Sequence, residues 1–118
     1  MFKATQQNLP TDVAIFTAAV SDFKIKKKHK KKIPKQENLV IDLEKNIDIL
    51  NYVSNHNSKR PKLVIGFAAE THNLEKNAIN KLQNKNCDWI IANDISKKEG
   101  GFDSELNEVI IYLSLIHI

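Results

Sequence analysis

Three apolar segments of this chain each run directly into a short polar signature. The segments are DVAIFTAAV (Asp12 to Val20), KLVIGFAA (Lys62 to Ala69) and DWIIA (Asp88 to Ala92). They are rich in Val, Ile, Phe and Ala and lack strict alternation, which is typical of parallel strands whose two faces are both covered by helices. We therefore predict an α/β fold with an open, mostly parallel sheet flanked by helices.

The polar signatures that follow these segments are AAVSDF, GFAAET and ANDIS. In an open parallel sheet, ligands bind in the crevice beyond the carboxyl ends of the strands. The side chains expected to converge on one bound molecule there are Asp22, Glu70, Asn93 and Asp94. The sequence thus predicts a ligand site at this edge of the sheet.

Length and composition fit one small globular domain. With 118 residues, 42% of them hydrophobic, residues 1–118 are expected to form a single domain, although both ends resemble cuts in something larger and point to a partial one. No apolar stretch approaches the ~20 residues of a membrane span, which predicts a cytoplasmic protein with no membrane partner. Cys87, the single cysteine, has no basic residue directly beside it and is expected to pack rather than to react.

The positive charge of the chain comes from one segment. Lys24–Lys35 (KIKKKHKKKIPK) holds eight of the eighteen basic residues and no acidic ones, while the rest of the chain has ten basic and fourteen acidic residues. It lies within Asp22–Gln36, where we predict a long basic loop of the kind that forms a lid over strand ends. Composition alone favours a solvated loop without a ligand. Nucleic-acid binding is a third interpretation, but no aromatic platform or helix-turn-helix pattern supports specific recognition.

Turn signals and periodicity predict the remaining elements. These are a short edge strand over Asn38–Leu43, a helix over Ile47–Asn55 with Asn46 as its N-cap, a helix over Asn73–Lys85 and a final strand over Val109–Ile116. Leu74, Ala78 and Leu82 give the second helix an apolar stripe. Lys81 and Lys85 fall near that stripe, where they either snorkel at the edge of the core or face the ligand crevice.

Several kinds of chemistry are poorly supported. The chain has three glycines and contains neither GxGxxG nor GxxxxGK[ST], so a standard phosphate-binding loop is absent. Its four histidines lack metal-ligand spacing, and Ser21 and Ser96 lack a nucleophile elbow, which argues against zinc and serine hydrolase sites. The basic loop with Lys81 and Lys85 instead suits several phosphates. Asp22, directly after a strand, suits Mg²⁺ or a sugar hydroxyl.

Five segments resemble one enzyme family in order and spacing. AAVSDF is similar to the family's AAVADY, KKIPKQ to KIKK, VIGFAAET to VVGFAAET, CDWIIANDIS to ADLIVANDVS, and GFDSELNEVIIY to its closing GFGSDENEV strand. The family is phosphopantothenate–cysteine ligase, the synthetase of bacterial coenzyme A biosynthesis, usually fused behind a flavin-dependent decarboxylase. The resemblance runs from about Leu9 to Leu113 and implies a Rossmann-like, nucleotide-binding fold.

The resemblance also implies a reaction and a site. Members activate the carboxylate of 4'-phosphopantothenate with CTP, and cysteine then displaces CMP from the acyl-cytidylate. The implied cofactor is Mg²⁺, bound at Asp22, and no flavin is expected in this chain. The matching nucleotide-binding positions are Asp22, Lys32, Ile47, Asp48, Ile49, Leu50, Phe67, Lys81 and Lys85, with support from Ala18, Asn93 and Asp94. Lys32 matches the catalytic lysine of the family's flap, and Phe67 matches the residue under the base.

The family's N-terminal portion, with its first strands and glycine-rich phosphate-binding turn, has no counterpart in this sequence. We therefore expect a Rossmann-like domain that lacks those strands and has little ligase activity alone. A homodimer, or pairing with a separate N-terminal synthetase chain, would complete the site. The alternative interpretation is a non-catalytic remnant or a small basic module that binds polyanions.

Overall fold

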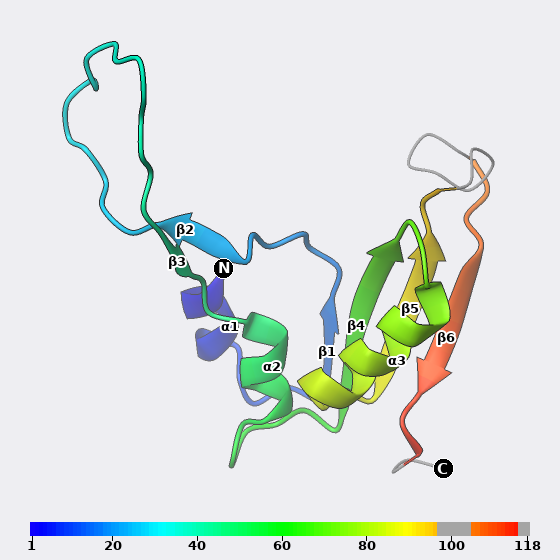
Figure 1. The fold of residues 1–118 in the computed structure, drawn as a ribbon. Coiled ribbons are helices and arrows are strands. Elements are labelled where there is room, and N and C mark those ends of the chain that lie inside the picture. The colour runs from blue at the N-terminus through cyan, green and yellow to red at the C-terminus, as the bar shows by residue number, and fades with distance from the viewer. Residues whose placement is uncertain (97–104, 116–118) are drawn as a thin grey trace.

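The protein is built around a four-stranded sheet in the order β1-β4-β5-β6 (Figure 1). The computed structural model describes residues 1–96 and 105–115. The strands are β1 (Val13–Phe16), β4 (Leu63–Glu70), β5 (Trp89–Asp94) and β6 (Val109–Leu113). β1, β4 and β5 are parallel, and β6 is antiparallel to β5. The predicted α/β fold with a mostly parallel sheet is confirmed; the final strand is shorter than predicted, and Ile116 lies outside the described residues.

Two helices, α2 (Ile49–Ser54) and α3 (Leu74–Lys85), pack on one face of this sheet. A third, α1 (Phe2–Gln7), which no sequence signal predicted, contacts α2 through the edge-to-face rings of Phe2 and Tyr52, with centroids 4.8 Å apart. The core between the helices and the sheet contains Ile49, Leu50, Val53, Val64, Ala68, Ala78, Leu82, Cys87, Ile90 and Ala92. The predicted packing role of Cys87 is thereby confirmed. No helix of the described residues is long and apolar enough to cross a membrane.

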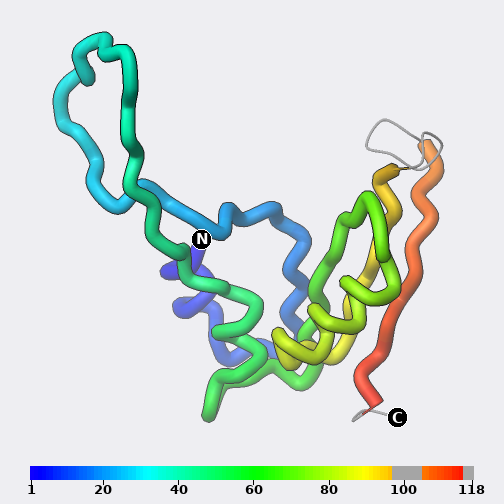
Figure 2. Tube along the Cα trace, in the orientation of Figure 1, coloured from blue at the N-terminus to red at the C-terminus, as the bar shows by residue number. Residues whose placement is uncertain are grey.

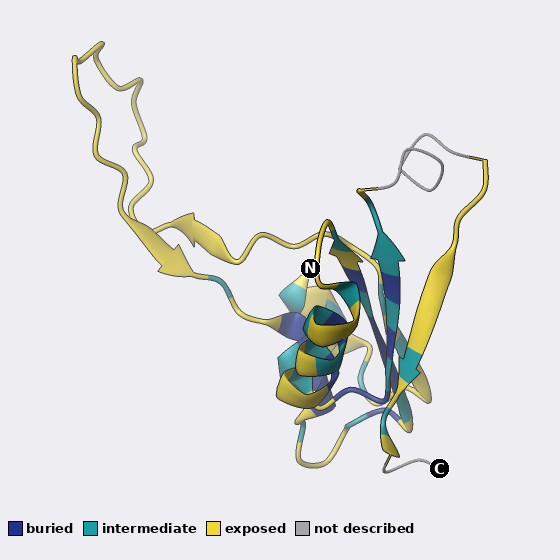
Figure 3. Ribbon diagram, turned by 45° about the vertical axis from the view of Figure 1, so that its right-hand side comes forward, coloured by how far each residue is buried: buried dark blue, intermediate teal, exposed yellow. Residues whose placement is uncertain are grey.

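The opposite face of the sheet carries no helix among the described residues (Figure 3). Side chains alternate along a strand, so the residues between core positions point to this face. One row across the four strands consists of Ile15, Ile65, Trp89 and Leu113. Ile15 is 58% exposed and Leu113 is 48% exposed at the two ends of the row, whereas Ile65 between them is 6% exposed. An apolar row of this kind is typical of a sheet surface that a further layer covers.

An arm projects from the body between β1 and α2 (Figures 1 and 2). Its base is an antiparallel hairpin of β2 (Phe23–Ile25) and β3 (Leu43–Lys45), and residues 26–42 form no helix or strand. The radius of gyration is 17.7 Å, against about 13.5 Å for a compact chain of this length.

The loop predicted over 22–36 is partly wrong because it contains β2. The edge strand predicted over 38–43 is wrong because the pairing segment begins at Leu43 and joins the hairpin, not the main sheet.

β1 is shorter than the strand predicted over 12–20. It pairs with β4 only from Val13 to Phe16, and the chain then leaves the sheet toward the arm. β4 continues to Glu70 beside β5, so its outer half has no strand of residues 1–96 or 105–115 on the β1 side. This divergence of two neighbouring strands opens the space in which the candidate site lies.

Candidate functional site

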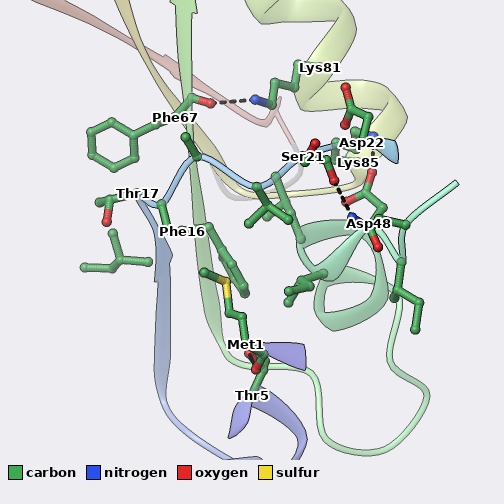
Figure 4. A pocket seen from close by; sticks show the side chains of 18 of the residues that line it. Met1, Thr5, Phe16, Thr17, Ser21, Asp22, Asp48, Phe67, Lys81 and Lys85 are labelled. Atoms are coloured by element: carbon green, nitrogen blue, oxygen red, sulfur yellow. Dashed lines mark hydrogen bonds and ion pairs between the residues drawn. The ribbon is translucent and has the colours of Figure 1, made fainter. Parts of the chain in front are cut away.

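A pocket of about 690 Å³ lies beyond the carboxyl end of β1 (Figure 4). Its walls come from α1, the segment after β1, the start of α2, β4 and α3. The residues that line it are Met1, Thr5, Ile15, Phe16, Thr17, Ala18, Ala19, Val20, Ser21, Asp22, Asn46, Ile47, Asp48, Ile49, Leu50, Phe67, Ala69, Lys81 and Lys85. Of the predicted site residues, the pocket gathers Ala18, Asp22, Ile47, Asp48, Ile49, Leu50, Phe67, Lys81 and Lys85.

Asn46 holds two walls of this pocket together. Its backbone N–H donates to the Asp22 carbonyl at 2.8 Å, and its Nδ2 donates to the Ser21 carbonyl at 2.8 Å. These bonds fix Asp22 beside the start of α2. The prediction of Asn46 as the N-cap of that helix is wrong, because Asp48 is the cap and accepts a hydrogen bond from the Asn51 N–H at 3.0 Å.

Lys81 and Lys85 reach the pocket from α3. Lys81 Nζ donates to the carbonyl oxygen of Phe67 at 2.6 Å. Phe67 is the first residue of β4 beyond the last pair with β1, Phe16 with Gly66. Lys85 Nζ forms an ion pair with Asp48 Oδ2. Of the two positions that the sequence left open for these lysines, the structure favours the one that faces the crevice.

Asp48 and Lys85 are coupled electrostatically. Partial burial alone would raise the pKa of Asp48, but the hydrogen bonds from Lys85 and from the Asn51 N–H outweigh it and hold the pKa below its ordinary value of 3.8. The carboxylate is therefore ionised at neutral pH and compensates the charge of Lys85. Lys81, by contrast, has a neutral carbonyl as its partner.

Phe67 contributes to the pocket through both its backbone and its side chain. Figure 4 shows its ring and the Lys81 ammonium on opposite sides of the β4 backbone. A partly exposed aromatic ring can stack on a flat base, whereas an ammonium group suits a phosphate. The pocket is thus apolar on one side and charged on the other.

Lys32 lies outside this pocket. It is exposed in the arm, which projects away from the body (Figure 2). The other lysines of Lys24–Lys35 are exposed as well, and none of that segment lines the pocket.

The polar residues that end β4 and β5 also lie outside the pocket. Asn93 Nδ2 donates to Asn107 Oδ1 at 2.7 Å, and Asp94 Oδ1 accepts a hydrogen bond from the Ser96 N–H at 2.9 Å. Glu70 Oε2 accepts from Asn77 Nδ2 at 3.0 Å. Of the four strand-end side chains expected to converge, the structure brings only Asp22 to the pocket.

A divalent cation has few protein ligands in this region. Within residues 1–96 and 105–115, no three His, Cys, Asp or Glu side chains group as a metal site. Asp22 and Asp48 both line the pocket, but Asp48 is engaged by Lys85 and Asn51. One carboxylate together with substrate phosphates is a common way to hold Mg²⁺, so Asp22 fits the expected cation as a single protein ligand.

Sequence reasoning missed the residues that shape the pocket without charge. Ile15 and Phe16 belong to a segment whose pattern predicts core, and they line the pocket because β1 ends beside it, at Phe16. Thr5 belongs to the unpredicted α1 and Met1 directly precedes that helix, and neither residue carries a sequence signal. The sequence does carry a capping signal here, since Asn46 and Asp48 are both good capping residues, and this signal does not distinguish the two positions.

Together these features define an α/β domain with an open, mostly parallel sheet and a ligand pocket beyond a strand end. Comparison with known proteins gives the family. The chain belongs to the DNA/pantothenate metabolism flavoprotein C-terminal domain family, whose model matches residues 1–115. The predicted kinship with the coenzyme A biosynthesis proteins is confirmed.

Similar proteins carry the name coenzyme A biosynthesis bifunctional protein CoaBC. The chain is 38% identical over 103 residues to the protein of Bacillus subtilis strain 168 and 40% identical over 111 residues to that of Escherichia coli K12. These alignments cover 86% and 91% of this chain but only 25% and 26% of the relatives. The chain therefore spans about a quarter of the length of the curated relatives it matches.

A solved structure shares the fold. The crystal structure of the C-terminal domain of CoaBC is 37% identical to this chain, with a TM-score of 0.61. The match covers 94% of this chain and 50% of that one. The Rossmann-like fold class predicted from the sequence is therefore confirmed, with a match to half of the solved chain.

Proposed function

We propose that this chain supplies the nucleotide-binding part of a CTP-dependent phosphopantothenate–cysteine ligase in coenzyme A biosynthesis. The observation that carries the proposal is the lining of one pocket, which includes two lysines of α3, an aromatic residue of β4 and a carboxylate that follows β1. Phosphates, a base and a cation are the three parts of a metal-bound nucleotide. The names of the relatives support the metabolic role, and the proposal includes the predicted cytoplasmic location.

Each group has a role in this proposal. Lys81 and Lys85 bind the triphosphate of CTP, and Phe67 stacks on the base. Residues 47–50 contact the nucleotide through their backbone. Asp22 is the residue that holds Mg²⁺, which when bound neutralises charge on the phosphates. The carboxylate of 4'-phosphopantothenate attacks the phosphate next to the ribose, which breaks the bond to the β-phosphate, forms the acyl-cytidylate and releases pyrophosphate, and fixed cations stabilise the charge that develops there.

Lys32 acts in this proposal through closure of the arm. The hairpin at the base of the arm starts one residue after Asp22, and Asn46 ties that base to the pocket wall. Attraction between the arm lysines and a bound triphosphate favours a closed position over the pocket. Closure supplies a cation only when substrate is present, which suits the role of Lys32 in acyl transfer to the nucleotide.

The remaining half of the domain is the proposed partner. The outer edge of β1 pairs with no strand of the described residues, and the apolar row that includes Ile15 and Trp89 lies beside it. The match to half of the solved chain indicates that a domain of this fold has about as much chain again. A layer docked on this face would complete the site for 4'-phosphopantothenate and cysteine. A second copy of this chain, pairing through β6, is the alternative partner.

Trp89 provides a test of this docking because it is the single tryptophan and lies on the bare face. Adding the other half of a CoaBC C-terminal domain as a separate polypeptide should shift its fluorescence to shorter wavelengths. Ile15→Lys should prevent the shift, and Lys76→Glu on the exposed side of α3 should not. A shift that survives Ile15→Lys would argue against docking on this face.

A second function rests on the arm. Its eight lysines over Lys24–Lys35 are exposed and would bind any polyanion with strong salt dependence. Such a module needs neither the pocket nor a base.

Calorimetric titration separates the two functions. The ligase proposal predicts tighter binding of CTP than of ATP, with affinity that depends on Mg²⁺ and exceeds that of inorganic tripolyphosphate. Equal affinity for all three, falling together as salt is added, would favour the polyanion module.

A further inference from the structure

Asp48 is shared between two structural tasks at the wall of the pocket. Its Oδ1 caps α2 by accepting from the Asn51 N–H at 3.0 Å, and its Oδ2 pairs with Lys85 Nζ. The pair joins the first turn of α2 to the last turn of α3 (Figure 4). The side chains of Asp48 and Lys85 are 40% and 33% exposed, so a ligand in the pocket can reach both.

This pair makes Lys85 different from Lys81. Lys81 gives its hydrogen bond to a neutral carbonyl and interacts with Asp48 only through space. The charge of Lys85 is compensated by a carboxylate that lines the same pocket. Any phosphate that binds Lys85 therefore has to displace Asp48 or tolerate its negative charge nearby.

We propose that Asp48 competes with bound phosphates for Lys85 and thereby limits the affinity of the pocket for polyphosphates. This inference rests on the proposed nucleotide site and assigns a specificity-determining role to a side chain within it. When a polyphosphate leaves, Lys85 returns to Asp48, so the carboxylate favours release of a strongly charged product. The cost in affinity is small because a partly exposed ion pair contributes little.

The substitution Asp48→Asn separates the two tasks of this residue. Asparagine caps a helix about as well as aspartate, so the bond to the Asn51 N–H is retained. Its amide carries no charge and cannot compensate Lys85. Glu75→Gln is the matched control, because it removes one negative charge from an exposed position in the first turn of α3.

The probe is inorganic tripolyphosphate added to the full chain, with affinity taken from the NMR shifts of the backbone amides of residues 46–50. This readout ignores binding to the arm. Asp48→Asn should tighten binding about fivefold, in keeping with the strength of an exposed ion pair, and Glu75→Gln should change it less than twofold. Equal or weaker binding by Asp48→Asn, including no binding by either chain, overturns the inference.

A double substitution shows whether Asp48 acts through Lys85. In a Lys85→Met background, Asp48→Asn should give less than a twofold gain, because the cation for which it competes is gone and only its through-space interaction with Lys81 remains. The same fivefold gain in that background overturns the inference in favour of a general charge effect. The two proposals fail separately: absent CTP preference with a Lys85-dependent gain contradicts only the ligase function, and CTP preference without the gain contradicts only the role of Asp48.

Discussion

Lys81 Nζ lies 2.6 Å from the carbonyl oxygen of Phe67, and this bond spans the gap that β1 leaves when it ends at Phe16. A strand-end carbonyl in a sheet normally has a neighbouring N–H as its partner. Here a side chain from α3 takes that place, so a cation is held inside the crevice. The same early end of β1 thus creates both the space for a ligand and the position of a charge that suits phosphate.

Lys81→Met and Lys85→Met should each weaken CTP binding roughly tenfold, because each removes a charge-assisted hydrogen bond to a phosphate. Lys76→Met, on the exposed side of α3, should have no effect. Calorimetry with CTP measures this. Binding of tripolyphosphate to the arm should persist in all three variants, and unchanged CTP affinity in both pocket variants would locate binding in the arm.

Gly66→Ala should destabilise the chain by about 1–3 kcal/mol. A Cβ at Gly66 would lie 2.8 Å from Leu50 Cδ2 and 2.9 Å from Ile90 Cδ1, inside a close-packed core. Urea unfolding measures the loss. Leu50→Val removes one of the two clashes, so the double variant should lose less than the sum of the single losses, and strict additivity would contradict this packing.

Arg60→Met should destabilise the chain by about 3 kcal/mol. Arg60 donates from Nη1 and Nη2 to the two carboxylate oxygens of the buried Asp88, at 3.2 and 3.1 Å. Removing the guanidinium leaves a buried charge with fewer partners. Arg60→Lys should recover part of the loss, since an ammonium cannot bind both oxygens.

Denaturant unfolding with Lys59→Met as the control tests the Arg60 prediction. Lys59 is the exposed neighbour of Arg60 and forms no ion pair with the described residues. If Arg60→Met and Lys59→Met lost the same stability, the carboxylate of Asp88 would not depend on the guanidinium.

Cys87 should react slowly in the folded chain. Burial raises the pKa of its thiol from 9.0 to about 11, which lowers the thiolate fraction at pH 8 about a hundredfold. Alkylation by iodoacetamide should be slower by that factor than in urea. Equal rates in the two conditions would show that the thiol is accessible.

The same shift gives a pH dependence of stability. A group whose folded pKa is raised contributes stability that is complete below its unfolded pKa, near 9.0, and is lost as pH rises toward 11. Stability should therefore fall in that window, and the fall should be smaller in Cys87→Ala. Unfolding curves between pH 8 and 11, taken on both chains, provide the comparison.

The sequence predicted the elements whose signals are long and local. The stripe of Leu74, Ala78 and Leu82 correctly predicted α3. The apolar run before Glu70 correctly predicted β4, with bounds within one residue of those in the structure. The end of β1 at Phe16 could not be predicted, because Thr17 to Val20 continue the same composition and only the path toward the arm takes them out of the sheet.

The sequence predicted the charged residues of the pocket better than it predicted the contacts that give the pocket its shape. Asp22, Lys81 and Lys85 came from strand-end position, helical spacing and resemblance, and the pocket gathers all three. The pairing of Asp48 with Lys85 joins residues that lie far apart in the chain, so no local pattern contains it. The position of the arm was beyond prediction for a different reason, since residues 26–42 are exposed throughout and form no helix or strand.

The most direct test of the account is to map CTP binding on the full chain by two-dimensional NMR in the presence of Mg²⁺. If the pocket binds CTP, the largest shifts should occur at residues 46–50 and at Phe67, Lys81 and Lys85, and CTP should produce them at lower concentration than ATP. Shifts confined to Lys24–Lys35, with equal response to both nucleotides, would contradict it.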